Sequence, residues 1–128
     1  MVSACTESKK PESPTDNMTI DTKESEQARQ LRHMVLFKFK ASASAEEITA
    51  VEEAFAALPA KIPEIKGYEW GINNSPEGLN KGFTHGFLLT FDSEEGRAAY
   101  LPHPDHQAFG SLLQPVLEDV MVLDYWAL

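Results

Sequence analysis

Apolar and polar side chains alternate along four short segments of the chain, with the two-residue period of a strand that has one buried face. The four segments are residues 32–40 (RHMVLFKFK), 65–73 (IKGYEWGIN), 83–91 (FTHGFLLTF) and 117–126 (LEDVMVLDYW). Between the second and the third, the stretch NSPEGLNKG supplies residues that favour turns. We therefore predict four strands, with the middle two joined by a loop.

Helical spacing replaces this alternation between the first two strands. Apolar residues recur three or four positions apart in SAEEITAVEEAFAALPAKIP, and Ser44 with Glu47 forms a capping box at its start. We expect the prolines Pro59 and Pro63 to end this helix.

A second, interrupted helix is predicted between the third and fourth strands. It starts at Asp92 or Ser93, is broken by Pro102 and Pro104, and is followed by a helical piece over residues 107–113. The element order is then β-α-β-β-α-β. This order predicts an α+β, ferredoxin-like fold with a four-stranded antiparallel sheet and both helices on one face.

The sheet face without helices is expected to be too apolar to remain in water. The side chains that we place on it are Tyr68, Trp70 and Ile72 from the second strand and Met121, Leu123 and Tyr125 from the fourth. We predict a symmetric homodimer in which two sheets pack face to face into an α/β barrel.

Residues 1–31 are rich in Ser, Thr, Glu, Lys and Pro and poor in large apolar side chains, so we predict a disordered tail ahead of one domain over residues 32–128. Residues 22–32 are compatible with a short helix. VSAC, ending at Cys5, looks like a bacterial lipobox followed by a polar tether, but no basic and apolar leader precedes it. Two locations stay open: the bacterial cell envelope if Cys5 is lipidated, and the cytoplasm if the chain starts at Met1.

Composition narrows the function classes. Charged residues make up 24% of the chain and the formal net charge is −9, which argues against nucleic acid because phosphates are bound by Lys and Arg. No apolar run approaches the roughly 18 residues of a membrane helix, so none is predicted. A single cysteine excludes an internal disulfide and a cysteine-based zinc site.

Four histidines and a tyrosine are the candidate chemistry of the chain. We expect the first and third strands to be parallel neighbours, so that His33 and His85, both early in their strands, lie at one end of the sheet. The second helix is expected to finish at that end, and its stretch YLPHPDHQAF carries Tyr100, His103 and His106. The sequence thus predicts one pocket, between helices and sheet, into which all five side chains converge.

Such a pocket suits acid–base chemistry. A neutral histidine is a natural general base near neutral pH, and a tyrosine hydroxyl can donate a hydrogen bond to a carbonyl as it becomes an enolate. Apolar walls would hold a hydrophobic substrate and exclude water. The expected wall residues are Val35, Phe37, Val51, Phe55 and Phe87.

Two other interpretations of the histidines are weighed against this one. Each can be a hydrogen-bonded core residue, with the prolines only breaking a helix. His103 and His106 also have the i, i+3 spacing of metal ligands, but the prolines spoil a regular helical face, so we predict no metal site and no cofactor.

Several segments together resemble the stress-responsive A/B barrel (Dabb) family of dimeric α/β barrel proteins. They are RHMVLFKFK, EWGINNSPEG, FTHGFLLTF, YLPHPDHQAF and VMVLDY. The resemblance runs from about Arg32 to Tyr125 and implies a homodimer. A plant enzyme of the family closes a polyketide by an aldol-type reaction with a histidine base and a tyrosine partner. By motif position these roles fall on His106 and Tyr100, with His33 at the pocket entrance as a supporting group. The predicted topology adds His85 and His103 to the expected ligand-binding residues.

Three functions are therefore considered. The first is a homodimer that binds a small hydrophobic carbonyl compound without turnover. The second is a cofactor-free cyclase or isomerase with His106 as general base and Tyr100 as hydrogen-bond donor. The third is a cofactor-free monooxygenase, for which Trp70, Asn73 and Asn74 are the candidate residues. Fold alone does not decide among them.

Overall fold

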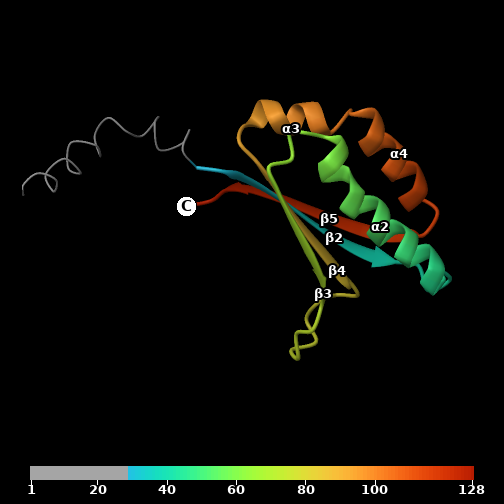
Figure 1. Cartoon of the computed structure of the whole chain (residues 1–128). Coiled ribbons are helices and arrows are strands. Elements are labelled where there is room, and N and C mark those ends of the chain that lie inside the picture. Colours follow the sequence, from blue (N-terminus) through green and yellow to red (C-terminus); the bar gives the residue numbers. More distant parts are fainter. Residues whose placement is uncertain (1–28) are drawn as a thin grey trace, which may run out of the picture.

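One four-stranded sheet carries all three helices of the described chain on a single face (Figure 1). This computed structural model describes residues 29–128. The strands are β2 (Leu31–Phe39), β3 (Gly67–Ile72), β4 (His85–Phe91) and β5 (Leu117–Trp126). The helices are α2 (Ala45–Lys61), α3 (Glu94–Tyr100) and α4 (Pro104–Leu113). The element order confirms the predicted ferredoxin-like α+β fold.

The strands lie in the order β3-β4-β2-β5, and every neighbouring pair is antiparallel. The prediction that the first and third strands are parallel is wrong. Helix α2 returns the chain so that β3 runs in the direction of β2, and the β3–β4 connection then reverses β4. His33 consequently pairs with Leu89 and His85 with Phe37, so the two histidines lie at opposite ends of the sheet.

Helix α2 begins at the predicted capping box. The Glu47 N–H donates to Ser44 Oγ at 3.1 Å, and the Ser44 N–H donates to Glu47 Oε1 at 2.9 Å. Pro59 does not end the helix, which continues to Lys61. A proline inside a helix removes one donor but does not stop the turns that follow when the apolar face stays packed, and Leu58 and Ile62 on either side are both buried.

The interrupted second helix is confirmed as two helices. The side chain of Ser93 accepts a hydrogen bond from Gly96 N–H and caps α3. Pro104 is not only a breaker, because it occupies the first turn of α4, where a missing N–H costs nothing.

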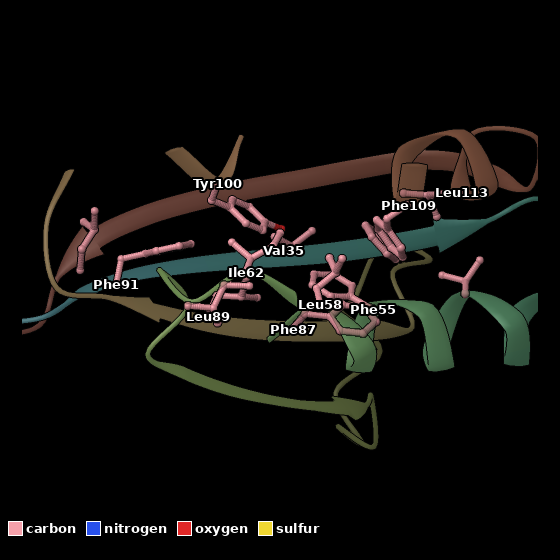
Figure 2. Packing of buried hydrophobic residues seen from close by; sticks show 14 of the residues in the cluster. Val35, Phe55, Leu58, Ile62, Phe87, Leu89, Phe91, Tyr100, Phe109 and Leu113 are labelled. Atoms are coloured by element: carbon pink, nitrogen blue, oxygen red, sulfur yellow. The ribbon is translucent and has the colours of Figure 1, made fainter. Parts of the chain in front are cut away.

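The core lies between the helices and the sheet and is dominated by aromatic rings (Figure 2). Phe55 of α2 stacks on Phe87 of β4 with ring centroids 4.2 Å apart, and Phe37 of β2 lies 5.0 Å from Phe87. Leu31 is also buried, at 2% exposure, so β2 and the core begin one residue before the predicted domain boundary.

The face away from the helices is apolar, but only half of the prediction for it is right. Met121, Leu123 and Tyr125 lie on it and are 48%, 56% and 41% exposed; they pair with Leu36, Met34 and Arg32 of β2. The second-strand residues do not. Tyr68, Trp70 and Ile72 pair with Leu89, Phe87 and His85, whose side chains face the helices, because residues opposite each other in a sheet share a face.

The tail predictions, including Cys5, lie outside the described residues. The same holds for residues 22–28 of the possible short helix, whose last two residues, Leu31 and Arg32, belong to β2. Within residues 29–128, no helix is both long enough and apolar enough to cross a membrane.

Candidate functional site

A cavity of about 720 Å³ lies between the sheet and helices α3 and α4. Its polar lining residues are His33, Arg97, Tyr100, His106 and Asp124. Its other lining residues are Val35, Phe37, Phe55, Leu101, Phe109, Gly110, Leu113, Val120 and Val122. Six of the residues that were predicted to surround a pocket line this cavity: His33, Tyr100, His106, Val35, Phe37 and Phe55.

His106 and Tyr100 contact each other in this cavity, with ring centroids 4.3 Å apart. His106 Nδ1 lies 2.8 Å from the carbonyl oxygen of Leu101. A carbonyl can only accept, so Nδ1 carries the hydrogen and donates it. The lone pair of the neutral ring is then on Nε2, which leaves this atom as the proton acceptor of His106.

His33 reaches the cavity from the sheet and is held by a carboxylate that was not predicted. Its Nδ1 lies 2.8 Å from Asp124 Oδ1, and Arg97 Nη1 donates to Asp124 Oδ2 at 2.7 Å. His33 is buried, at 6% exposure, while Arg97 and Asp124 are partly buried. The His33 ring meets the Tyr100 ring edge to face at 5.7 Å.

Tyr100 is 1% exposed and reaches from the end of α3 toward the sheet (Figure 2). Burial, reinforced by the charge that Tyr68 would carry, raises the pKa of Tyr100 above its usual range. Burial also raises the pKa of Tyr68 to about 12. Tyr100 is therefore a neutral hydrogen-bond donor near neutral pH, and not a base.

These two tyrosines predict a loss of stability in alkali. Their pKa values in the folded protein lie above the ordinary value of about 10, so their contribution to stability is complete below about pH 10. The part due to Tyr68 is lost as the pH rises from 10 through 12, and the part due to Tyr100 continues to be lost at still higher pH. Urea unfolding at pH 9 and at pH 11 should show lower stability at pH 11. In Tyr68→Phe, which has one titrating group fewer, the drop between the two pH values should be smaller. An equal drop in the variant and in the parent would contradict the assignment to Tyr68.

His85 is not part of this cavity. Its Nε2 lies 2.7 Å from Glu52 Oε2 and its Nδ1 lies 2.8 Å from Thr84 Oγ1, so both ring nitrogens are engaged. It lines a second cavity of about 600 Å³ at the other end of the sheet. The prediction that His85 converges with the other histidines is wrong because it rested on parallel strands.

His103 is a helix cap. The N–H of Asp105 donates to His103 Nδ1 at 3.1 Å, at the N-terminus of α4. An accepting Nδ1 carries no hydrogen, so the cap uses the neutral ring. His103 is not among the residues that line the main cavity.

Two of the predicted wall residues belong to the core instead. Val51 and Phe87 are 0% and 1% exposed and lie behind the cavity lining. The candidate monooxygenase residues are also elsewhere: Trp70 stacks on His85, and Asn73 lines the second cavity. The described part of the chain holds no cluster of three or more side chains suited to a metal ion.

Sequence reasoning missed Arg97 and Asp124. The sequence did carry a signal for Asp124. It lies on the same face of its strand as Val120 and Val122, so a charged side chain occupies a position that faces the helices. Arg97 gave no such signal, since it is one of three charged residues in a short helix and its partner comes from another element.

Comparison with known proteins identifies the family of this chain. The family described as "Stress responsive A/B Barrel Domain" matches residues 31–127. The stress-response A/B barrel domain-containing protein HS1 of Arabidopsis thaliana is 37% identical over 95 residues, which cover 74% of this chain and 87% of HS1. Olivetolic acid cyclase of Cannabis sativa is 27% identical over 95 residues, covering 74% of this chain and 94% of the cyclase.

Solved structures share the fold of this chain. A hydroxynitrile lyase from Passiflora edulis superimposes with a TM-score of 0.72 at 28% identity, covering 77% of this chain and 93% of the lyase. A protein from Thermobifida fusca, described as dimeric, ferredoxin-like and of unknown function, gives a TM-score of 0.67 at 31% identity, covering 79% and 93% of the two chains. The match over nearly the whole described domain, together with the shared fold, shows that the chain belongs to the stress responsive A/B barrel domain family.

Proposed function

We propose that the protein binds a small hydrophobic carbonyl compound in the main cavity and makes or breaks a carbon–carbon bond next to the carbonyl, without a cofactor. The contact between His106 and Tyr100 carries this proposal. It joins a histidine whose Nδ1–H is fixed, and whose Nε2 accepts protons, to a tyrosine that stays protonated. Both line a cavity whose remaining walls are mainly apolar.

In the cleavage direction, His106 Nε2 accepts the proton of the hydroxyl group on the carbon that becomes the new carbonyl. The carbon–carbon bond breaks as the carbonyl forms, and the departing fragment leaves with the electron pair as an enolate or a cyanide ion. The imidazolium of His106 then returns the proton to that fragment. Tyr100 donates a hydrogen bond to the oxygen that loses its proton to His106 and becomes the carbonyl oxygen. The reverse sequence forms the bond.

The names of the relatives support this chemistry. A cyclase and a hydroxynitrile lyase are both similar to this chain over most of their length. A cyclase forms a ring and a hydroxynitrile lyase cleaves a cyanohydrin, so one fold accommodates bond formation and bond cleavage. Fold does not assign function by itself, and the proposal therefore rests on the cavity residues.

The test offers the purified protein two probes, an aromatic β-hydroxyketone and an aromatic cyanohydrin. Either probe releases an aromatic aldehyde, which is followed by its absorbance or fluorescence against the spontaneous rate. Binding of the matching aldehyde is measured separately by shifts of amide signals in NMR spectra. Turnover above background, with shifts at residues that line the cavity, supports the proposal. Binding without turnover of either probe removes its catalytic part, and absence of both overturns it.

We also propose that the protein is a homodimer that covers the face of the sheet opposite the helices. On this face Met34, Leu36 and Leu88 are half-buried, and they lie beside the exposed Met121, Leu123 and Tyr125 of β5. A contiguous apolar patch of this kind is normally covered in solution. The structural relative from Thermobifida fusca is described as dimeric.

Two exposed leucines test the dimer. Leu123→Glu places a charge on the open face and should convert the protein to a monomer at micromolar concentration, measured by sedimentation velocity. Leu112→Glu is the matched control, because Leu112 is 43% exposed but lies on α4, and it should leave the dimer intact. A dimer that survives Leu123→Glu would contradict the proposed interface.

A further inference from the structure

A chain of two hydrogen bonds links a solvent-accessible arginine to the most buried histidine of the main cavity. Arg97 Nη1 donates to Asp124 Oδ2 at 2.7 Å, and Asp124 Oδ1 lies 2.8 Å from His33 Nδ1. Three separate elements, α3, β5 and β2, supply the three side chains. The carboxylate is thus held from both sides, one oxygen for each partner.

The direction of these bonds fixes which nitrogen of His33 is free. An ionised carboxylate only accepts, so Nδ1 of His33 carries the hydrogen. In the neutral ring the lone pair is then on Nε2, as in His106. Two aromatic rings contact His33: that of Tyr100, whose hydroxyl stays protonated, and that of Phe91, which is apolar.

Within the hydrogen-bonded set of Arg97, Asp124 and His33, the charges balance without a charged histidine. Arg97 supplies the positive charge opposite the Asp124 carboxylate, so no imidazolium is needed there. Asp124 lies on an edge strand and its side chain is 22% exposed, so water competes for its oxygens. Arg97 counters this competition because it binds the oxygen that His33 does not use.

We propose that Arg97, acting through Asp124, is a positioning residue that fixes His33 as a second proton acceptor of the cavity. Two imidazoles with free Nε2 atoms then contact the same tyrosine, His106 at 4.3 Å and His33 at 5.7 Å between ring centroids. This extends the proposed function to reactions that move two protons. Such reactions include a ring closure followed by enolisation, or a proton transfer between two carbon atoms that flank a carbonyl.

The test reads the tautomer of His33 and needs no substrate. Protein labelled with ¹⁵N-histidine is studied by long-range ¹H–¹⁵N spectra at about pH 8, with His33→Asn to assign the signal. We expect His33 in the parent to carry its hydrogen on Nδ1, which is the less populated tautomer of free histidine. Arg97→Gln should lower that population, and Arg97→Lys, which keeps the charge, should restore part of it.

Lys66→Gln is the matched control, because Lys66 is an exposed cation next to β3 and is not among the cavity residues; it should leave the tautomer unchanged. Arg97→Met, which keeps the aliphatic stem, replaces the glutamine variant if circular dichroism shows that the latter is unfolded. A His33 tautomer that is unchanged in the Arg97 variants, or that changes equally in Lys66→Gln, would overturn the inference. The readout is independent of turnover, so this proposal and the proposed reaction can fail separately.

Discussion

His106→Ala should lower the turnover of a carbonyl probe by about 10²–10⁴-fold, the usual contribution of a general base, while the dissociation constant of the aldehyde changes little. The reason is that the His106 Nε2 atom, freed by the bond from Nδ1 to the Leu101 carbonyl, is the proposed proton acceptor for the hydroxyl of the probe. The apolar walls that hold the probe remain. The measurement is kcat and KM for the parent and the variant on the same probe, with the aldehyde dissociation constant from NMR titration.

A matched control separates a lost base from a damaged helix. Gln107→Ala changes the neighbouring residue of α4, which is exposed and is not among the cavity residues, and it should keep the parent rate. If His106→Ala retained the parent rate, His106 would not be the base. If it lost binding and rate in equal proportion, the site would be a binding site in which His106 only contacts the ligand.

Phe87→Ala should reduce the free energy of unfolding by about 3–5 kcal/mol, the range observed when a buried phenylalanine is truncated. Phe87 is 1% exposed and its ring lies against Phe55, Phe37 and Trp70 at centroid distances of 4.2, 5.0 and 5.7 Å. These neighbours come from three different elements, so they cannot all close on the cavity left behind. Urea unfolding at a fixed protomer concentration measures the change, because the stability of a dimer depends on concentration.

Leu79→Ala provides the comparison for this loss. Leu79 is 64% exposed in the loop between β3 and β4, and such a substitution usually changes stability by no more than about 0.5 kcal/mol. A loss in Phe87→Ala that is no larger than in Leu79→Ala would mean that the ring cluster does not hold the sheet to helix α2.

The sequence predicted the elements well because each is specified locally. The Ser44–Glu47 capping box, the two-residue alternation in β2 and the break at Pro102 all act within a few positions of the residues that show them. The placement of His106 and Tyr100 in one cavity also followed from a short stretch, because only five residues separate them from each other.

What the sequence did not predict depends on how distant elements meet. Alternation assigns a histidine such as His85 to one face of the sheet. Which end of the sheet it occupies is known only when the direction of its strand is known. Asp124, the partner of His33, is 91 residues away along the chain, and Arg97, the partner of Asp124, is 27 residues from it. No local pattern pairs these residues. Tyr68 shows the same limit, since alternation tells which residues share a face but not which face the helices cover.

Strand β5 gives alternate side chains to two different tasks. Val120, Val122 and Asp124 line the cavity, while Met121 and Leu123 lie on the opposite face, where a second copy is proposed to bind. Strand β5 therefore forms part of the cavity wall and part of the proposed subunit contact. A ligand that shifts β5 would also shift that contact. Occupancy and assembly are then thermodynamically linked, and the effect of each on the other is equal in free energy.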